Sequence, residues 1–108
     1  VGPGGEQRLE QVADILRRIG ERIPDEIDWV LQVEGHTDKR PILTPEFPSN
    51  WELSTARAQS IVYFLIEQGI APSRLAAVGY GEYQPVASGD DADALAQNRR
   101  IELRLSNR

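Results

Sequence analysis

Cysteine is absent from this chain of 108 residues, and histidine occurs only once. Without cysteine the chain has no disulfide framework, no thiolate metal site and no cysteine nucleophile. No apolar run approaches the roughly 18 residues that a membrane-spanning helix needs. No signal peptide is recognisable either. Any targeting or anchoring segment is therefore expected to lie outside this sequence.

Positive charge is also scarce. Twelve lysine and arginine residues stand against 17 acidic ones, giving a net charge of -5, and there is no basic run. Nucleic-acid binding is therefore not expected, because phosphate recognition usually needs a Lys/Arg-rich face. The apolar share of 40% and the charged share of 27% are those of one ordinary globular domain. We interpret residues 1–5, VGPGG, as a flexible lead-in or tag remnant and residues 6–108 as the domain.

Hydrophobic periodicity predicts an α+β fold. Alternation predicts strands over 29–35, 74–81 and 100–106. A second main helix is expected over 49–68, stopped by Gly69, and a short helical turn over 91–97. The first helix, over 6–22 and ended by Pro24, has an apolar stripe of Leu9, Val12, Ala13, Leu16, Ile19 and Ile23. We expect two main helices on one face of a small mixed sheet, with a strand before the first helix truncated.

The start of the second helix carries a capping signal. Ser49 followed by Glu52 forms the S-x-x-E pattern of a capping box. Asn50 is an alternative N-cap.

Arg57 interrupts the apolar stripe of this helix. At 100° per residue it falls between Leu53 and Ile61, in a stripe formed by Leu53, Ala56, Ser60, Ile61, Phe64 and Leu65. A charge turned toward apolar neighbours is costly unless it is paired or faces a wet cleft. Two interpretations stay open. Arg57 either bends into solvent or a local ion pair, or it lines a pocket where its parallel donors suit a carboxylate.

The end of the preceding strand supplies polar partners. Asp38 offers a carboxylate and Thr37 a hydroxyl. An acid near an arginine suits a zwitterion, with Asp38 for the ammonium and Arg57 for the carboxylate. The alternative role of Asp38 is an Asx-type turn. Arg99 shares strand parity with the apolar residues that follow it, so it either joins the same anion-binding cleft or bends into solvent.

Four segments resemble one known family. VEGHTD, NWELSTARA, LIEQGIAPSRLAAVGYGEYQP and NRRIE, in this order between about Leu31 and Leu103, are similar to the C-terminal peptidoglycan-binding domain of the OmpA/MotB family. The proline-bearing loop PILTPEFPS is closest to MotB-type proteins. The resemblance implies an OmpA-like βαβαβ sandwich. It also implies a non-enzymatic periplasmic module that anchors a membrane protein to the wall of a Gram-negative-type envelope by binding meso-diaminopimelate.

The resemblance assigns roles to particular residues. Asp38 and Arg57 are expected to hold the ammonium and carboxylate of diaminopimelate, and Thr37 to add a contact. Asn50 leads the helix motif, and Asn98 and Arg99 border the pocket. No metal or cofactor is implied. The expected partners are peptidoglycan and a second copy of the chain, with the membrane anchor elsewhere. Leu95 departs from the family pattern, where many members have an arginine.

Three alternatives compete with wall binding. His36 with Asp38 and a serine is a weak hydrolase candidate, since no nucleophile signature accompanies them. Glu34, His36 and Asp38 form a weak zinc candidate, because one histidine without cysteine is a poor ligand set. We expect the His36 imidazole to be satisfied by backbone instead. The third alternative is a dimerisation or interaction module without a ligand pocket, in which both arginines pair internally.

Overall fold

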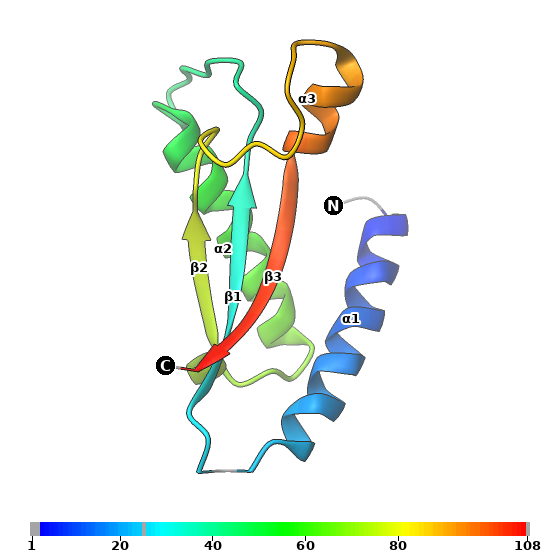
Figure 1. The fold of residues 1–108 in the computed structure, drawn as a ribbon. Helices are drawn as coiled ribbons and strands as arrows, with labels where there is room; N and C mark the ends of the chain where they lie inside the picture. The colour runs from blue at the N-terminus through cyan, green and yellow to red at the C-terminus, as the bar shows by residue number, and fades with distance from the viewer. Residues whose placement is uncertain (1–2, 25, 108) are drawn as a thin grey trace.

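The structure, a computed structural model, describes residues 3–24 and 26–107, with only the backbone described for residues 3–7 and Leu9. Two long helices lie beside a narrow sheet, and a short third helix lies at one end (Figure 1). In chain order the elements are α1 Pro3–Arg22, β1 Trp29–His36, α2 Asn50–Glu67, the 3-10 turn η1 Pro72–Arg74, β2 Leu75–Gly79, α3 Ala92–Asn98 and β3 Arg100–Asn107.

The described strands form one mixed sheet in the order β2-β1-β3. β1 runs parallel to β2 and antiparallel to β3. The ends of β1 and β2 therefore meet the start of β3 at one end of the sheet, where α2 begins and α3 ends (Figure 1). The predicted α+β class, with its small mixed sheet, is confirmed.

α1 begins earlier than the sequence predicted. Its first residue is Pro3, inside the segment interpreted as a lead-in, and residues 1–2 lie outside the described part. Proline is favoured in a first helical turn because its missing N–H has no intrahelical acceptor there. The helix ends at Arg22, before Pro24, as expected. The predicted apolar stripe is buried at Ala13, which is fully buried, but not at Ile19, which is 39% exposed. The Leu9 side chain lies outside the described part.

Both long helices pack on the same side of the sheet. Leu31 and Val33 of β1 are at most 2% exposed, and they share one core with residues of α1, α2 and the following turn: Ala13, Ala58, Ile61, Leu65 and Ile70. Alternation along β1 directs Glu34 and His36 to the opposite side, away from α2.

The buried stripe of α2 differs from the predicted one. Its buried members are Asn50, Ser54, Ala58, Ile61 and Leu65, whereas Ser60 is exposed and Leu53 and Ala56 are half-buried. Arg57 is exposed. The expectation that Arg57 points into the apolar stripe is therefore wrong, because the stripe is rotated toward the small residues.

Two glycines explain the rotation. A Cβ built on Gly35 would lie 2.1 Å from the backbone oxygen of Ser54, and one built on Gly79 would lie 2.0 Å from Oγ1 of Thr55. The strands thus approach the first turns of α2 closely, and only small side chains such as Ser54 and Ala58 fit between them. Arg57 is left at the edge of the contact, facing solvent.

Candidate ligand-binding site

An open pocket of about 350 Å³ lies at the C-terminal end of β1. It is lined by the segment after β1, the first two turns of α2 and the residue before β3: Thr37, Asp38, Arg40, Pro41, Ile42, Asn50, Leu53, Arg57 and Arg99. Five of the six residues predicted for the site are among them. The sixth, Asn98, is not.

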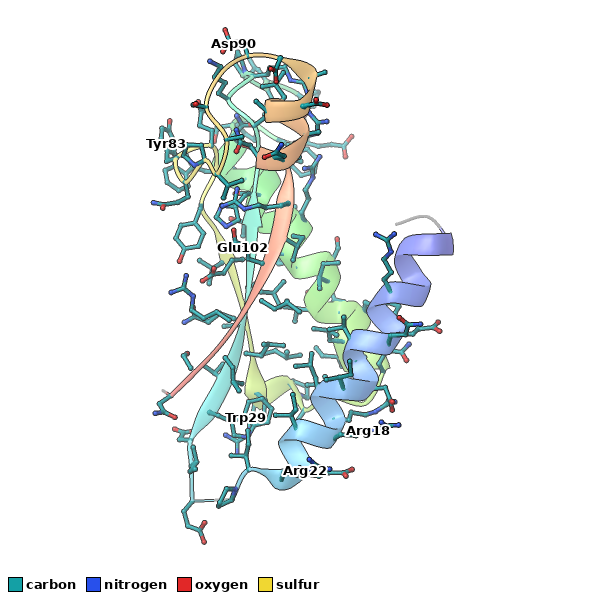
Figure 2. All side chains as sticks on the ribbon, turned by 45° about the vertical axis from the view of Figure 1, so that its right-hand side comes forward. Arg18, Arg22, Trp29, Tyr83, Asp90 and Glu102 are labelled. Atoms are coloured by element: carbon teal, nitrogen blue, oxygen red, sulfur yellow. The ribbon has the colours of Figure 1, made fainter. Side chains whose placement is uncertain are left out.

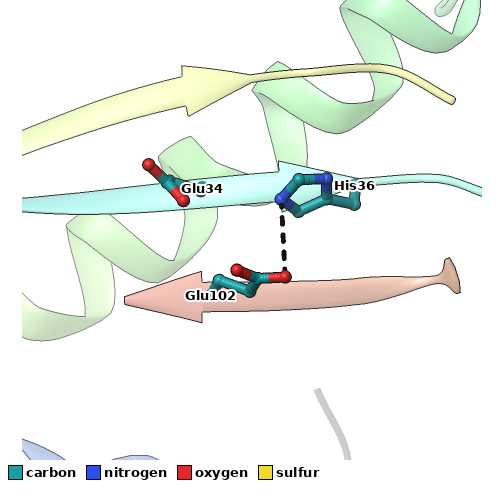
Figure 3. Close-up of side chains that lie close together, drawn as sticks. All are labelled: Glu34, His36 and Glu102. Atoms are coloured by element: carbon teal, nitrogen blue, oxygen red, sulfur yellow. Dashed lines mark ion pairs between the residues drawn. The ribbon is translucent and has the colours of Figure 1, made fainter. Parts of the chain in front are cut away.

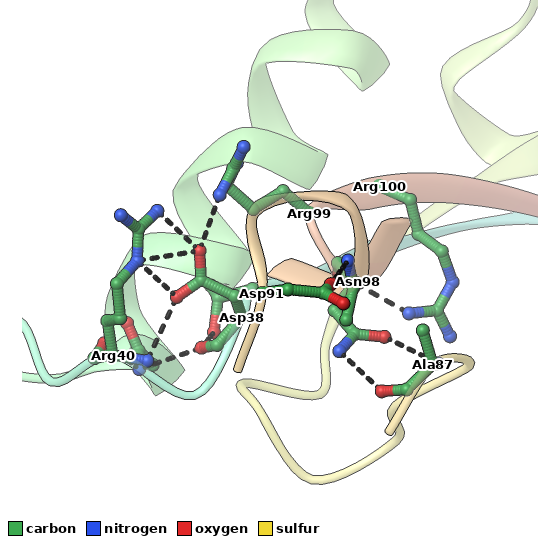
Figure 4. A network of polar contacts seen from close by, with 10 residues as sticks. Asp38, Arg40, Ala87, Asp91, Asn98, Arg99 and Arg100 are labelled. Carbon is green, nitrogen blue, oxygen red and sulfur yellow. Dashed lines mark hydrogen bonds and ion pairs between the residues drawn. The ribbon is translucent and has the colours of Figure 1, made fainter. Parts of the chain in front are cut away.

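Asp38 is held by two arginines at the floor of this pocket (Figure 4). Arg40 donates from its backbone N–H to Oδ1 at 2.9 Å and from Nη2 to Oδ2 at 2.7 Å. Arg99 donates from Nη1 to Oδ2 at 2.8 Å. The hydrogen bonds from Arg40, and then that from Arg99, hold the pKa of Asp38 well below its usual range although burial opposes this. The Asp38 carboxylate is thus charged at any physiological pH.

The bond from the backbone of Arg40 is an Asx-type turn, so the second interpretation of Asp38 is also right. Asp38 fixes the start of the loop and lines the pocket with the same carboxylate. Arg40 itself was missed by the sequence analysis. The spacing of two residues after Asp38 signals only the turn, through a backbone N–H that any residue except proline offers, and it does not signal the contact of the Arg40 guanidinium.

Arg57 differs from the other two arginines of the pocket. It is exposed, and it forms no hydrogen bond or ion pair with any residue that the structure describes. Its guanidinium therefore has all its donors available to a ligand or to water. We retain the expectation that Arg57 lines a pocket beside Asp38. Arg57 does so from the edge of the contact between α2 and the sheet, and not from the apolar stripe.

Asn50 and Thr37 are buried supports of the pocket wall. The Nδ2 group of Asn50 donates to the backbone oxygen of Arg40 at 3.1 Å and to Oε1 of Glu82 at 3.2 Å. The hydroxyl of Thr37 donates to the backbone oxygen of Asp38 at 2.9 Å. Asn50 is not the N-cap that was offered as an alternative. Ser49 caps α2, accepting from the backbone N–H of Trp51 at 3.2 Å and bonding to Glu52.

Asn98 acts behind the pocket and not at its border (Figure 4). It is 5% exposed. Its Oδ1 accepts from the backbone N–H groups of Val86 and Ala87 at 2.8 and 3.0 Å, and its Nδ2 donates to the oxygen of Ala87 at 2.9 Å. These three hydrogen bonds hold the loop after β2, so we correct the role of Asn98 from border residue to loop support. The neighbouring Arg99 is the residue that reaches Asp38.

The electrostatics of the pocket favour an anion. Three guanidiniums, of Arg40, Arg57 and Arg99, line the pocket together with the single carboxylate of Asp38, which leaves an excess of two positive charges. Guanidinium binds carboxylates through two parallel N–H groups, which gives geometric selectivity as well as attraction. Only Arg57 is without a partner among these groups in the described part of the chain.

Known proteins share the sequence pattern and the fold of this chain. The model of the OmpA family matches residues 2–99. The chain belongs to the OmpA family. Its curated relatives include Motility protein B of Bacillus subtilis, 46% identical over 66% of this chain and 28% of that protein. Another is the peptidoglycan-associated lipoprotein of Pseudomonas aeruginosa, 37% identical over 94% of this chain and 54% of that protein.

Solved structures give the same assignment. The C-terminal domain of Helicobacter pylori MotB matches with a TM-score of 0.84 at 27% identity, over 98% of this chain and 76% of that one. The predicted OmpA/MotB resemblance is confirmed. Because H. pylori MotB is also solved as a periplasmic domain, with a TM-score of 0.83 at 27% identity over 99% of this chain and 62% of that one, the expected periplasmic placement is confirmed at the level of the family.

This OmpA-family chain spans less than two thirds of the length of the curated relatives it matches. Within residues 3–24 and 26–107, no helix combines the length and apolar character needed to cross a bilayer.

Proposed function

We propose that this domain binds peptidoglycan without covalent chemistry, through meso-diaminopimelate of the stem peptide, and so anchors a membrane protein to the cell wall. The observation that carries the proposal is the exposed Arg57, which lines the pocket with no partner among the described residues. The name of the P. aeruginosa relative, a peptidoglycan-associated lipoprotein, supports the choice of polymer.

Arg57 supplies the group that recognises the free carboxylate of diaminopimelate. Both parallel N–H groups of its guanidinium are available, and Arg99 lies in the same pocket with its side chain 37% exposed. The side chain of a lysine-type stem peptide lacks this carboxylate. A site built to bond a polar group rejects the analogue without it, because the site's own donors are then left unpaired.

Asp38 supplies the matching group for the ammonium. Arg40 now occupies most of its oxygen lone pairs, but the Arg40 side chain is 61% exposed and reaches Asp38 from solvent. A ligand ammonium replaces the guanidinium of Arg40 while the backbone N–H of Arg40 and Nη1 of Arg99 keep the carboxylate in place. Arg40 thus acts as a counter-ion of the empty site.

The test is cosedimentation of the domain with purified sacculi. Arg57→Ala is expected to abolish retention by diaminopimelate-type sacculi and to leave the unfolding transition within about 0.5 kcal/mol of wild type, because the side chain is exposed. Arg18→Ala is the matched control, since Arg18 lies on α1 far from Asp90 and the pocket end (Figure 2). The control should pellet like wild type.

Two results would contradict the proposal. The first is retention of Arg57→Ala at the wild-type level. The second is equal binding of lysine-type and diaminopimelate-type sacculi, which would keep wall binding but remove the assigned ligand group. Incubation with wild-type protein should also leave the muropeptide profile unchanged, because binding requires no bond cleavage; new muropeptides would indicate an enzyme.

The alternative of a dimerisation module stays a prediction. Its internal pairing of both arginines is seen for Arg99 but not for Arg57. Sedimentation equilibrium of wild type and Arg57→Ala separates the two properties, since dimerisation through another surface would be unaffected by the substitution.

A further inference from the structure

A second polar cluster lies on the face of the sheet that turns away from α2. Glu34 and His36 of β1 and Glu102 of β3 lie side by side there (Figure 3). One ligand-type atom from each of the three lies within 4.8 Å of the others. These atoms adjoin an open pocket of about 310 Å³ that includes Tyr80 and Arg104. None of the three lines the pocket that contains Asp38.

His36 is the unusual member of this cluster. It is 3% exposed, and neither ring nitrogen has a hydrogen-bond partner among the described residues. Its Nε2 lies 4.0 Å from Oε2 of Glu102, beyond hydrogen-bond distance, and its ring stacks on Tyr80 with centroids 5.1 Å apart. The expectation that backbone satisfies this imidazole is therefore wrong. Leaving such a group buried without a partner destabilises the folded chain.

The imidazole is available as a ligand. Neither ring nitrogen is engaged by a described residue, so the nitrogen that carries no proton keeps its lone pair for a ligand. Burial, followed by the positive charge of Arg100, lowers the pKa of His36. Neutral imidazole is the form that coordinates metal ions.

The two carboxylates pair with arginines whose side chains are exposed to different degrees. Glu34 is 1% exposed. Its Oε2 forms an ion pair with Nε of Arg104 at 3.2 Å and accepts a hydrogen bond from the Tyr80 hydroxyl at 3.3 Å. The Arg104 side chain is 62% exposed and can turn into solvent. Glu102 pairs with Arg100, which is only 18% exposed and is tied to the backbone oxygen of Gln84.

We propose that Glu34, His36 and Glu102 form a binding site for a divalent first-row transition metal of the Zn²⁺ type, with Arg104 as the counter-ion that the metal displaces. One imidazole and two carboxylates are a ligand set that Zn²⁺ accepts, with water completing the coordination. Once Arg104 leaves, two carboxylates and the guanidinium of Arg100 give the site one net negative charge.

The proposal revises the zinc candidate read from the sequence. Asp38 was its third ligand, but Asp38 lies beyond the end of β1 and is taken by Arg40 and Arg99. Glu102 takes its place because the antiparallel register puts it opposite Glu34, with His36 two residues along the same face. Nothing in the sequence spacing alone joins residue 102 to residues 34 and 36.

The test is titration of the tag-free chain with ZnCl₂, followed by calorimetry and by NMR of the imidazole. His36 is the only histidine and cysteine is absent, so one ring reports on the site. We expect about one equivalent to bind and the ring resonances of His36 to shift. Glu102→Gln should weaken binding at least about tenfold, and Arg104→Gln should strengthen it severalfold because the competing cation is removed. Glu67→Gln, an exposed acid on α2, is the matched control and should bind like wild type.

Three results would overturn the proposal. They are unshifted imidazole resonances up to about 1 mM Zn²⁺, wild-type affinity in Glu102→Gln, and a loss in the Glu67→Gln control equal to that in Glu102→Gln. Glu102 and Arg104 are exposed enough to be replaced without unfolding the core, so the test does not depend on a His36 variant folding. Arg57→Ala should bind Zn²⁺ like wild type, which separates this site from wall binding.

Discussion

The pocket at the end of β1 and the cluster on the back of the sheet both pair carboxylates with arginines, but they leave different groups without a partner. In the pocket, Arg40 and Arg99 satisfy Asp38, and Arg57 is left over. On the back face, arginines hold both carboxylates, and the imidazole of His36 is left over. The remaining group is a cation in one place and a neutral lone-pair donor in the other.

The difference shows which ligand each place can take. A partnerless guanidinium attracts an anion, whereas a neutral imidazole beside carboxylates attracts a metal cation. The energetics also differ, because Arg57 is exposed and solvated by water, while His36 is buried and has no solvent to replace a partner. Leaving Arg57 without a protein partner costs little, whereas leaving the buried His36 without one destabilises the folded chain.

Gly35→Ala should have the largest effect, because Gly35 lies on β1 between Glu34 and His36 of the back-face cluster and shortly before Asp38 of the pocket. Its added Cβ would lie 2.1 Å from the backbone oxygen of Ser54, so β1 and α2 must separate. We expect a loss of about 3 kcal/mol or more in the free energy of unfolding, measured by urea denaturation. Gly20→Ala is the control, since its Cβ would meet only the Trp29 ring, at 3.2 Å, and should cost less than about 1 kcal/mol. A Gly35→Ala protein as stable as wild type would mean that this close approach is not needed.

Asp38→Asn should affect the pocket alone. The neutral amide loses the charge that Arg40 and Arg99 share, so we expect a loss of about 1–3 kcal/mol in stability, together with loss of sacculus binding. Imidazole resonances of His36 in Zn²⁺ titrations should behave as in wild type. Loss of both sacculus binding and Zn²⁺ binding in Asp38→Asn would show that the pocket and the back-face cluster are one unit.

The pH dependence of this variant follows from the depressed pKa of Asp38. The unfolded chain binds a proton at Asp38 near pH 3.9, whereas the folded chain binds it only at lower pH. The stability that Asp38 contributes is therefore complete above about pH 5 and is lost as the pH falls toward the folded pKa. Urea denaturation should show the gap between wild type and Asp38→Asn narrowing below about pH 4, and a constant gap would contradict the assignment.

Ser49→Ala should weaken the pocket through the position of α2. The hydroxyl of Ser49 accepts from the N–H of Trp51 and fixes where the helix begins. We expect a loss of about 1 kcal/mol in urea denaturation and a modest loss of sacculus binding, because Arg57 lies two turns further along. Thr at the same position should restore both, since its hydroxyl caps as well.

The sequence was sufficient for the fold and for most of the pocket because both depend on local patterns. Alternation predicted β1 and β3, and the capping signal at Ser49 placed α2 within a residue of its observed start. The predicted orientation of α2 was wrong. The orientation depends on how closely the strands approach the helix, and Gly35 permits this approach because it has no side chain. Hydrophobic periodicity cannot predict this effect, because it considers only which side chains are apolar.

The partners of the charged groups were harder to predict. Asp38 to Arg99 spans 61 residues, and Glu102 joins Glu34 only through the strand register. Nothing in the sequence distinguishes an arginine that pairs with Asp38 from one that stays available, so Arg40 was missed and Asn98 was placed at the border of the pocket. These choices depend on distances that only the folded chain defines.

Arg40→Ala should have the smallest effect on folding and the most informative effect on binding. The Arg40 side chain reaches Asp38 from solvent, and exposed ion pairs contribute little to stability. If this guanidinium occupies the place of the ligand ammonium, its removal leaves the Asp38 carboxylate to the ligand and should strengthen sacculus binding severalfold. Loss of binding would instead make Arg40 part of the anion site beside Arg57. Cosedimentation at several protein concentrations distinguishes the two outcomes, and the backbone N–H of Arg40 remains in the variant to keep the turn at Asp38.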